Sequence, residues 1–164
     1  MKKLLLMLLA LALMLTPFTA LAAEKVTEYD AAALIEDTAA EGSVNVYHWW
    51  TAGGEKDAIE SVISGFQAAY PSSQAKSNAI PGGAGGAMVM KVKVLQQAGK
   101  SPESFQAHPG EEIQPYLDAD MLLDLSAVWE YAGLEERVLP GIADLCQTED
   151  GKYYIVPVGV HKTN

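Results

Sequence analysis

The alternation of apolar and polar residues divides the chain into strand-like and helix-like segments. Residues 44–50 are mostly β-branched or aromatic, which is typical of a short buried strand, and residues 74–80 and 104–108 predict two more strands. Apolar residues recur at helical spacing after Gly53-Gly54 up to residue 69, and again over residues 87–97. Strand and helix therefore alternate, and this order predicts an α/β fold with a mostly parallel sheet flanked by helices.

The flanking segments have weaker patterns. Residues 24–41 predict a peripheral amphipathic helix that ends at Gly42, and short helices are predicted over residues 111–120, 126–131, 134–139 and 141–146. Asp150-Gly151 predicts a hairpin turn between residues 145–148 and 153–160. No further element follows that last apolar strand, so we expect a polypeptide that is cut short.

The N-terminus has the three-part layout of a secretory signal. Lys2 and Lys3 precede an apolar run over residues 4–15, and the small-residue sequence Ala20-Leu21-Ala22 follows. This run is shorter than the roughly 20 residues that a membrane-spanning helix needs. We therefore expect cleavage after Ala22 and, since no cysteine lies near that point, a periplasmic product without a lipid anchor.

Composition and charge narrow the class of protein. The 164 residues are 49% hydrophobic and 20% charged, which is typical of a globular domain. The net charge of −10 argues against a nucleic-acid partner, because binding to phosphates requires a basic surface. The single cysteine, Cys146, cannot form a disulfide within the chain, and we expect it to be a buried thiol.

The candidate binding residues lie where predicted strands end. Trp49 and Trp50 end the first strand, and ligands of open α/β sheets bind outside the carboxyl ends of the strands. Alternation along a strand sends the two indoles to opposite sides, so we expect at most one to be core and the other to face a ligand crevice. An alternative is that both tryptophans fill the core.

Polar residues at the third strand add hydrogen-bonding capacity. Gln106 and His108 lie two residues apart and should share a face, offering donors and acceptors to a polyhydroxylated ligand. The glycine-rich residues 81–86 lack a phosphate-binding motif, and we expect a loop whose N–H groups face a polar ligand. Lys91, in the following helix, is either a surface residue or a donor to that ligand.

The sequence offers no clear catalytic or metal motif. His48, His108 and His161 have separations that match no compact zinc site. The pairs Glu111-Glu112 and Asp118 with Asp120 have the positions of surface charges, and this interpretation is favoured over a glycosidase pair. We therefore expect a protein that is not an enzyme and that holds no metal or cofactor.

An ordered series of short motifs carries a family resemblance. The series is Trp49-Trp50 before Gly-Gly-Glu, Ala-Tyr-Pro at 69–71, Pro-Gly-Gly-Ala-Gly at 81–85, Gly-Lys-Ser-Pro-Glu-Ser-Phe-Gln-Ala-His at 99–108, Asp-Leu-Ser at 124–126 and Gly-Lys-Tyr-Tyr-Ile-Val-Pro-Val at 151–158. It resembles the extracellular sugar-binding proteins of bacterial ABC transporters, solute-binding family 1, and most of all the glucose- and mannose-binding branch. Members of that family are two-lobed α/β proteins that close on a sugar and deliver it to a membrane permease.

The resemblance implies roles for particular residues and a division of the chain. It implies that Trp49, Trp50, Lys91, Gln106, His108 and His161 bind sugar. Gly159 and Lys162 depart from the family pattern around His161. It also implies a signal peptide over residues 1–22, a helical extension over 23–43, and a truncated N-terminal lobe over 44–164, with the second lobe missing.

These observations favour a periplasmic sugar-binding component of an ABC import system. We expect it to be a monomer that binds a monosaccharide such as glucose or mannose and serves an inner-membrane permease. Two alternatives remain open at this stage. One is a fragment of a secreted carbohydrate-active enzyme, which needs two carboxylates facing one cleft. The other is a small stand-alone periplasmic receptor.

Overall fold

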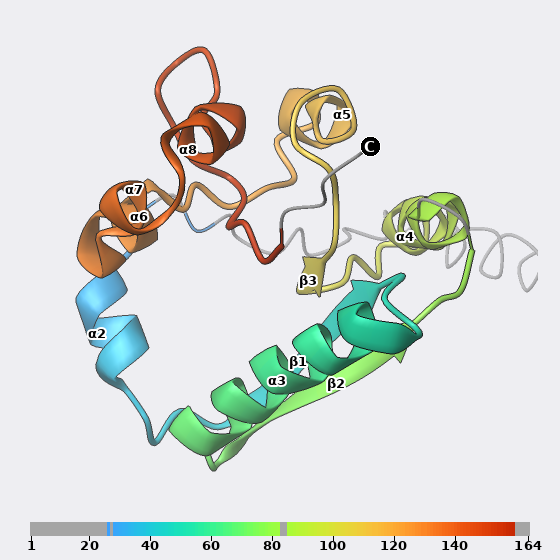
Figure 1. The fold of residues 1–164 in the computed structure, drawn as a ribbon, viewed down its shortest axis with the longest axis horizontal. Helices are drawn as coiled ribbons and strands as arrows, with labels where there is room; N and C mark the ends of the chain where they lie inside the picture. Colours follow the sequence, from blue (N-terminus) through green and yellow to red (C-terminus); the bar gives the residue numbers. More distant parts are fainter. Residues whose placement is uncertain (1–25, 27, 83–84, 160–164) are drawn as a thin grey trace, which may run out of the picture.

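The computed structural model describes residues 26, 28–82 and 85–159 of the chain (Figure 1). The described residues contain a parallel sheet of strands β1 (Gly42–His48), β2 (Ser73–Ala79) and β3 (Ser104–Phe105), in the order β2-β1-β3. The helices are α2 (Ala31–Glu36), α3 (Gly53–Ala69), α4 (Gly86–Gln97), α5 (Gln114–Asp118), α6 (Ser126–Ala132), α7 (Leu134–Arg137) and α8 (Pro140–Cys146). The predicted α/β class, with a parallel sheet flanked by helices, is confirmed.

Parallel pairing brings the ends of the three strands to one edge. Gly42 pairs with Ser73 and His48 with Ala79, so β1 and β2 end together. The hydrogen-bond pattern continues one step further, because the Ile80 N–H donates to the His48 carbonyl and the Gln106 N–H donates to the Tyr47 carbonyl, both at 2.8 Å. The segments that leave the sheet after these strands therefore start as neighbours.

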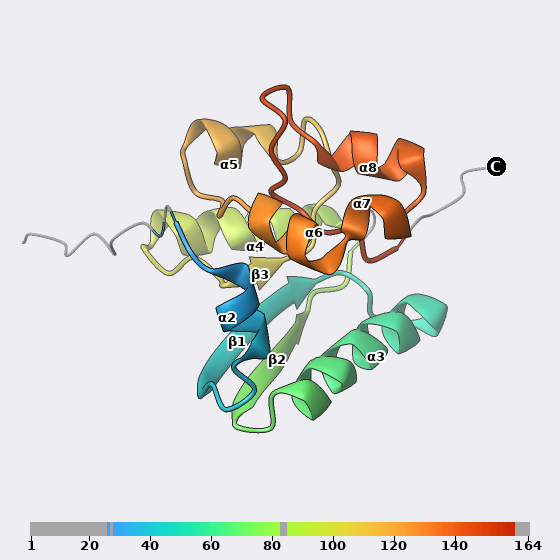
Figure 2. The same cartoon turned by 90° about the vertical axis from the view of Figure 1, so that its left-hand side faces the viewer.

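The helices cover the sheet unequally. Figure 2 shows α3 along one side of β1 and β2, while α4 to α8 gather beyond the ends toward which the strand arrows point. Helix α3 buries Ile59. Among the described residues, no helix is long and apolar enough to cross a membrane.

Two apolar clusters hold the helices in place. Met88 and Val92 of α4 and Tyr116 of α5 form the first, against which Trp49 and Phe105 pack from the sheet edge. The second joins α6, α8 and the segment after them, and its buried members are Trp129, Ala143, Cys146 and Tyr153. Trp129 and Tyr153 stack with ring centroids 4.0 Å apart. Burial raises the pKa of the Cys146 thiol, as expected for a thiol in an apolar cluster.

The predicted N-terminal helix is much shorter than expected. Helix α2 covers Ala31–Glu36, capped by the Asp30 carboxylate, which accepts from the Ala33 N–H at 3.0 Å. Glu36 and Asp37 stand at its C-terminal end, where negative charge opposes the helix dipole. Gly42, expected to end that helix, instead begins β1. The predicted signal peptide lies outside the described residues.

The predicted hairpin near the C-terminus forms only in part, as a turn with one bridge. A single antiparallel bridge joins Gln147 and Tyr153, and no strand forms over the described part of residues 153–160. The backbone of this segment is bound to α6 instead. The Tyr153 N–H donates to Ser126 Oγ at 3.1 Å, and the Leu125 N–H donates to the Tyr153 carbonyl at 2.6 Å. Trp129 Nε1 donates to the Ile155 carbonyl at 2.9 Å.

Candidate functional site

The two tryptophans follow β1 and differ in burial. Strand β1 ends at His48, so Trp49 and Trp50 lie beyond it. Alternation of side chains along the strand therefore does not explain why the two indoles differ in burial. Trp50 is only 4% exposed and belongs to the core, whereas Trp49 is half-buried at the strand end. Trp49 is therefore the indole of this pair that a ligand can reach.

A close approach of the glycine-rich loop supports the Trp49 ring. Gly85 has a φ of +77°, and a Cβ placed on it would lie 2.5 Å from Cε3 of Trp49. Only a residue without a side chain fits both this left-handed backbone and the indole pressed against it. The structure places Gly85 of this loop against the Trp49 ring, and the predicted contact between the loop N–H groups and a ligand stays a prediction.

Gln106 and His108 both contact Trp49. The side-chain oxygen Oε1 of Gln106 accepts the Trp49 backbone N–H at 3.1 Å. The His108 ring packs against the indole with centroids 4.9 Å apart and an interplanar angle of 31°. Strand β3 is shorter than predicted and ends at Phe105, yet the two side chains still converge. The structure thus brings Trp49, Gln106 and His108 together, and we call these residues the tryptophan wall.

Two other predicted site residues do not join this wall. Lys91 is exposed on α4, and the residues of that helix that pack in the cluster with Trp49 are Met88, Val89 and Val92. The described part of the chain shows no contact between Lys91 and the tryptophan wall. His161 lies outside the described residues.

Glu112 was missed as a site residue because its sequence position indicated a surface charge. Its carboxylate accepts the backbone N–H of His108 at 3.1 Å and contacts His108 Nδ1 at 2.9 Å. Residues 111–113 form a turn, and α5 begins only at Gln114, three residues later than predicted. The spacing of four residues between His108 and Glu112 was the sequence feature that could have indicated a contact between them.

His48 supports the site from within the fold. It is 2% exposed, and its Nε2 lies 2.8 Å from Ser77 Oγ on β2. Burial lowers the pKa of this imidazole, and the backbone carbonyl of Trp50 opposes the shift in part. His48 therefore links the end of β1 to β2 as a neutral core residue, and sequence reasoning considered it only as a candidate zinc ligand.

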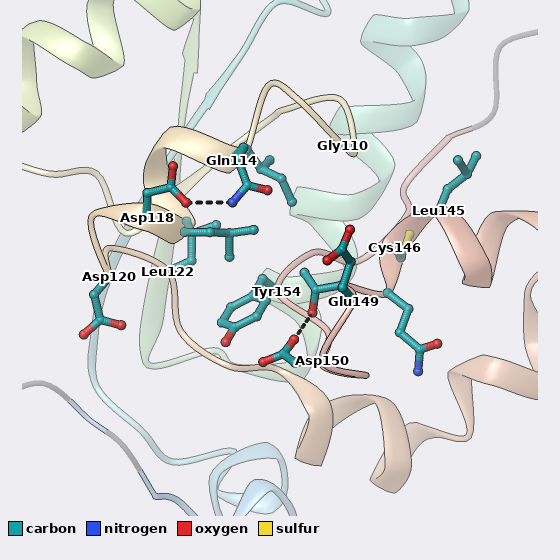
Figure 3. Close-up of a pocket in the computed structure, with 14 residues that line it drawn as sticks. Gly110, Gln114, Asp118, Asp120, Leu122, Leu145, Cys146, Glu149, Asp150 and Tyr154 are labelled. Carbon is teal, nitrogen blue, oxygen red and sulfur yellow. Dashed lines mark hydrogen bonds between the residues drawn. The ribbon is translucent and has the colours of Figure 1, made fainter.

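A separate pocket lies between α5 and the turn after α8 (Figure 3). Its volume is about 510 Å³, and its lining includes the carboxylates Asp118, Asp120, Glu149 and Asp150. Gln114 donates to Asp118 at 2.7 Å and the Thr148 hydroxyl donates to Asp150 at 2.6 Å. The pocket contains none of the residues of the tryptophan wall, and these four carboxylates are exposed to solvent.

The chain is similar in sequence to extracellular binding proteins of ABC transporters. It is 35% identical over 121 residues to an uncharacterized ABC transporter extracellular-binding protein of Pyrococcus horikoshii, an alignment that covers 74% of this chain and 27% of that protein. It is 31% identical over 121 residues to a probable sugar-binding periplasmic protein of Mesorhizobium japonicum, covering 74% and 28%. A glucose-binding protein of Saccharolobus solfataricus is 34% identical over 73 residues, which cover 44% and 13%. No protein-family profile matches the chain.

Solved structures give the same picture of the fold. A chitin oligosaccharide binding protein superposes with a TM-score of 0.59 at 26% identity, covering 71% of this chain and 28% of that one. A probable secreted solute-binding lipoprotein of Streptomyces coelicolor superposes with a TM-score of 0.56 at 14% identity, covering 68% and 27%. The fold is that of a lobe of a solute-binding protein, and the chain spans about a quarter of the length of the relatives it matches.

Proposed function

We propose that this chain is part of the periplasmic sugar-binding component of an ABC import system. The observation that carries the proposal is the tryptophan wall at the carboxyl end of the parallel sheet, where solute-binding folds hold their ligands. The sequence relatives named as sugar-binding proteins support the same assignment. The expected ligand is a monosaccharide such as glucose or mannose, which the protein delivers to an inner-membrane permease.

The tryptophan wall has the chemistry that a sugar requires. The half-buried indole of Trp49 offers an apolar surface for the C–H groups of a pyranose ring. Gln106 uses its oxygen on the Trp49 backbone, so its amide nitrogen remains to donate to a ligand hydroxyl. His108 adds an imidazole beside the indole. Stacking and directed hydrogen bonds together distinguish a sugar from a purely apolar ligand.

The proposed protein has a signal peptide, a short extension and an N-terminal lobe, and its sugar site lies between this lobe and a second one. Residues 1–22 act as a cleaved signal peptide without a lipid anchor, and residues 23–43 form a short extension. Residues 44–164 are the proposed N-terminal lobe, and its first strand, β1, already begins at Gly42, two residues before that boundary. In the proposed two-lobed protein, a second lobe supplies the opposite wall and closes over the sugar as a hinge bends. Lys91 and His161 remain proposed sugar contacts in the closed protein, whereas Trp50, predicted as a further contact, is buried in the core.

Replacing Trp49 by Ala tests this function. In a two-lobed version of the protein, Trp49→Ala should weaken glucose binding by about 1–3 kcal/mol, because a stacked aromatic anchor is lost. Isothermal titration calorimetry measures the effect. Lys100→Ala is the control, since Lys100 is exposed in the turn after α4. Equal, small effects for the two variants would contradict the proposed site.

A further inference from the structure

Glu112 holds His108 at two points. Its Oε1 accepts the His108 backbone N–H at 3.1 Å, and its Oε2 lies 2.9 Å from the ring nitrogen Nδ1. The Glu112 side chain is 25% exposed, whereas that of His108 is 54% exposed and open to a ligand. The indole of Trp49 packs against the same imidazole with centroids 4.9 Å apart. The ring is therefore fixed by a carboxylate and an aromatic face.

The two hydrogen bonds determine where the ring proton lies. A carboxylate oxygen only accepts hydrogen bonds, so Nδ1 must be the donor in this contact. A neutral imidazole carries one proton, and the nitrogen that it occupies is set by the hydrogen bond that this nitrogen makes. With the proton on Nδ1, the nitrogen Nε2 of neutral His108 is an acceptor.

We propose that Glu112 is a positioning residue of the tryptophan wall, which orients His108 and makes its Nε2 an acceptor for a hydroxyl of the ligand. This inference rests on the proposed sugar-binding function, because it assigns a ligand contact to that same wall. In this arrangement two side chains share the hydrogen bonds to the ligand. Gln106 donates through its amide nitrogen, and His108 accepts through Nε2, so a sugar hydroxyl can both accept and donate there.

The variant Glu112→Gln tests the assignment with almost no change in shape. A glutamine has one oxygen and one NH₂ group, so it cannot accept from the His108 N–H and from Nδ1 at the same time. If the oxygen keeps the backbone hydrogen bond, the NH₂ group faces Nδ1, which then becomes an acceptor. The proton moves to Nε2, and the nitrogen available to the ligand changes from acceptor to donor.

Nitrogen-15 NMR of the imidazole rings in the present chain reads the tautomer without any ligand. At about pH 8.5, where a free imidazole is neutral, His108 of the unsubstituted chain should carry its proton on Nδ1. Glu112→Gln and Glu112→Ala should both shift the proton population toward Nε2. Glu111→Gln, a change at the exposed neighbouring residue, should leave the tautomer unchanged. The variant His108→Gln identifies the resonance, and circular dichroism checks folding.

Two results would overturn the inference. The first is a His108 ring that is protonated on Nε2 in the unsubstituted chain. The second is a tautomer of His108 that does not change between the unsubstituted chain and the variants Glu112→Gln and Glu112→Ala. Sugar binding is measured separately, in the two-lobed version, where Glu112→Gln should weaken glucose binding about three- to tenfold through one lost hydrogen bond. Failure of every version to bind sugar, with the tautomer switched as expected, would overturn the proposed function and not the role of Glu112 toward His108.

Discussion

Single residues behind the tryptophan wall set its geometry. Gly85 combines a left-handed backbone with an indole in contact, so replacing it by Ala brings two costs together. The added Cβ would meet the Trp49 ring at 2.5 Å, and the φ of +77° disfavours any side chain. Gly85→Ala should therefore lower the free energy of unfolding by roughly 1–3 kcal/mol and displace Trp49. Urea unfolding and tryptophan fluorescence measure the two effects.

Gly86→Ala is the matched control for this prediction. Gly86 is the next residue, has no positive φ, and would carry a Cβ into open space. It lies at the first position of α4, where Ala is favourable. We expect Gly86→Ala to leave stability unchanged or slightly increased. Similar losses in both variants would show that the loop, and not the contact with Trp49, is sensitive.

His48 makes stability depend on pH in the acid range. Burial lowers the pKa of His48 in the folded chain, against partial opposition from the Trp50 carbonyl. Well above the ordinary imidazole pKa of about 6.5, the ring is neutral in both states and contributes nothing to the pH dependence. Near and below that pKa the unfolded chain takes up a proton that the folded chain does not. The free energy of unfolding should therefore fall with acidification until the pH reaches the lower, folded-state pKa.

Urea unfolding at about pH 7.5 and about pH 5.5 tests the role of His48. The unsubstituted chain should lose more stability between these pH values than His48→Gln, which has no imidazole to protonate there. The quantity compared is the change in the free energy of unfolding between the two pH values. His48→Gln also alters the contact with Ser77 and therefore changes stability at both pH values. Identical changes in the two chains would contradict the assignment of a buried, neutral His48.

The elements divide into those that local pattern predicts and those that depend on contacts. β1, α3, β2 and α4 lie within a few residues of the predicted bounds, because apolar periodicity and the glycines between them define each one. The position of Trp49 at the end of β1 was predictable for the same reason. The roles of three residues were not recognised. Gly85 and His48 act through contacts with residues that are distant in the sequence, Trp49 and Ser77. Glu112 contacts the nearby His108, but its position indicated a surface charge.

The C-terminal segment shows how tertiary contacts override a local signal. Asp150-Gly151 does form a turn, but only Tyr153 is paired across it, with Gln147, and the chain from Tyr153 onward is also bound by α6 and the residue before it. Ser126 Oγ, the Leu125 N–H and the Trp129 indole each bond to the backbone of residues 153–155. No local pattern shows that these donors and acceptors become neighbours, so the Asp-Gly signal and the apolar segment after it predicted a strand that does not form.

Trp129 should therefore stabilise two elements at once. It is buried, stacks on Tyr153, and donates to the Ile155 carbonyl. Trp129→Ala should lower the free energy of unfolding by about 3–5 kcal/mol through the cavity and the lost hydrogen bond. Hydrogen exchange of residues 153–155 should rise in the same variant. Leu139→Ala is the control, because Leu139 is 69% exposed. A similar loss in that control would contradict the proposed role of Trp129.

At the scale of the whole molecule, the tryptophan wall is assembled but open. Its residues come from the end of β1 and the end of β3, and the loop before α4 and the turn before α5 support them. The side chain of His108 remains 54% exposed. The relatives that the chain matches are about four times as long as the matched segment. The described residues provide no second wall opposite the tryptophan wall that could enclose a sugar.

We therefore expect the 164-residue chain by itself to bind free monosaccharides poorly or not at all. Every sugar hydroxyl loses hydrogen bonds to water on binding, and affinity arises only when nearly all of them find new partners in a cleft that excludes water. Trp49, Gln106 and His108 satisfy one face and leave the other in solvent. Titration calorimetry of the chain against glucose, galactose and mannose measures this. A dissociation constant near or below about 1 μM for any of the three, corresponding to roughly −8 kcal/mol, would contradict the single-wall proposal and favour a self-sufficient small receptor.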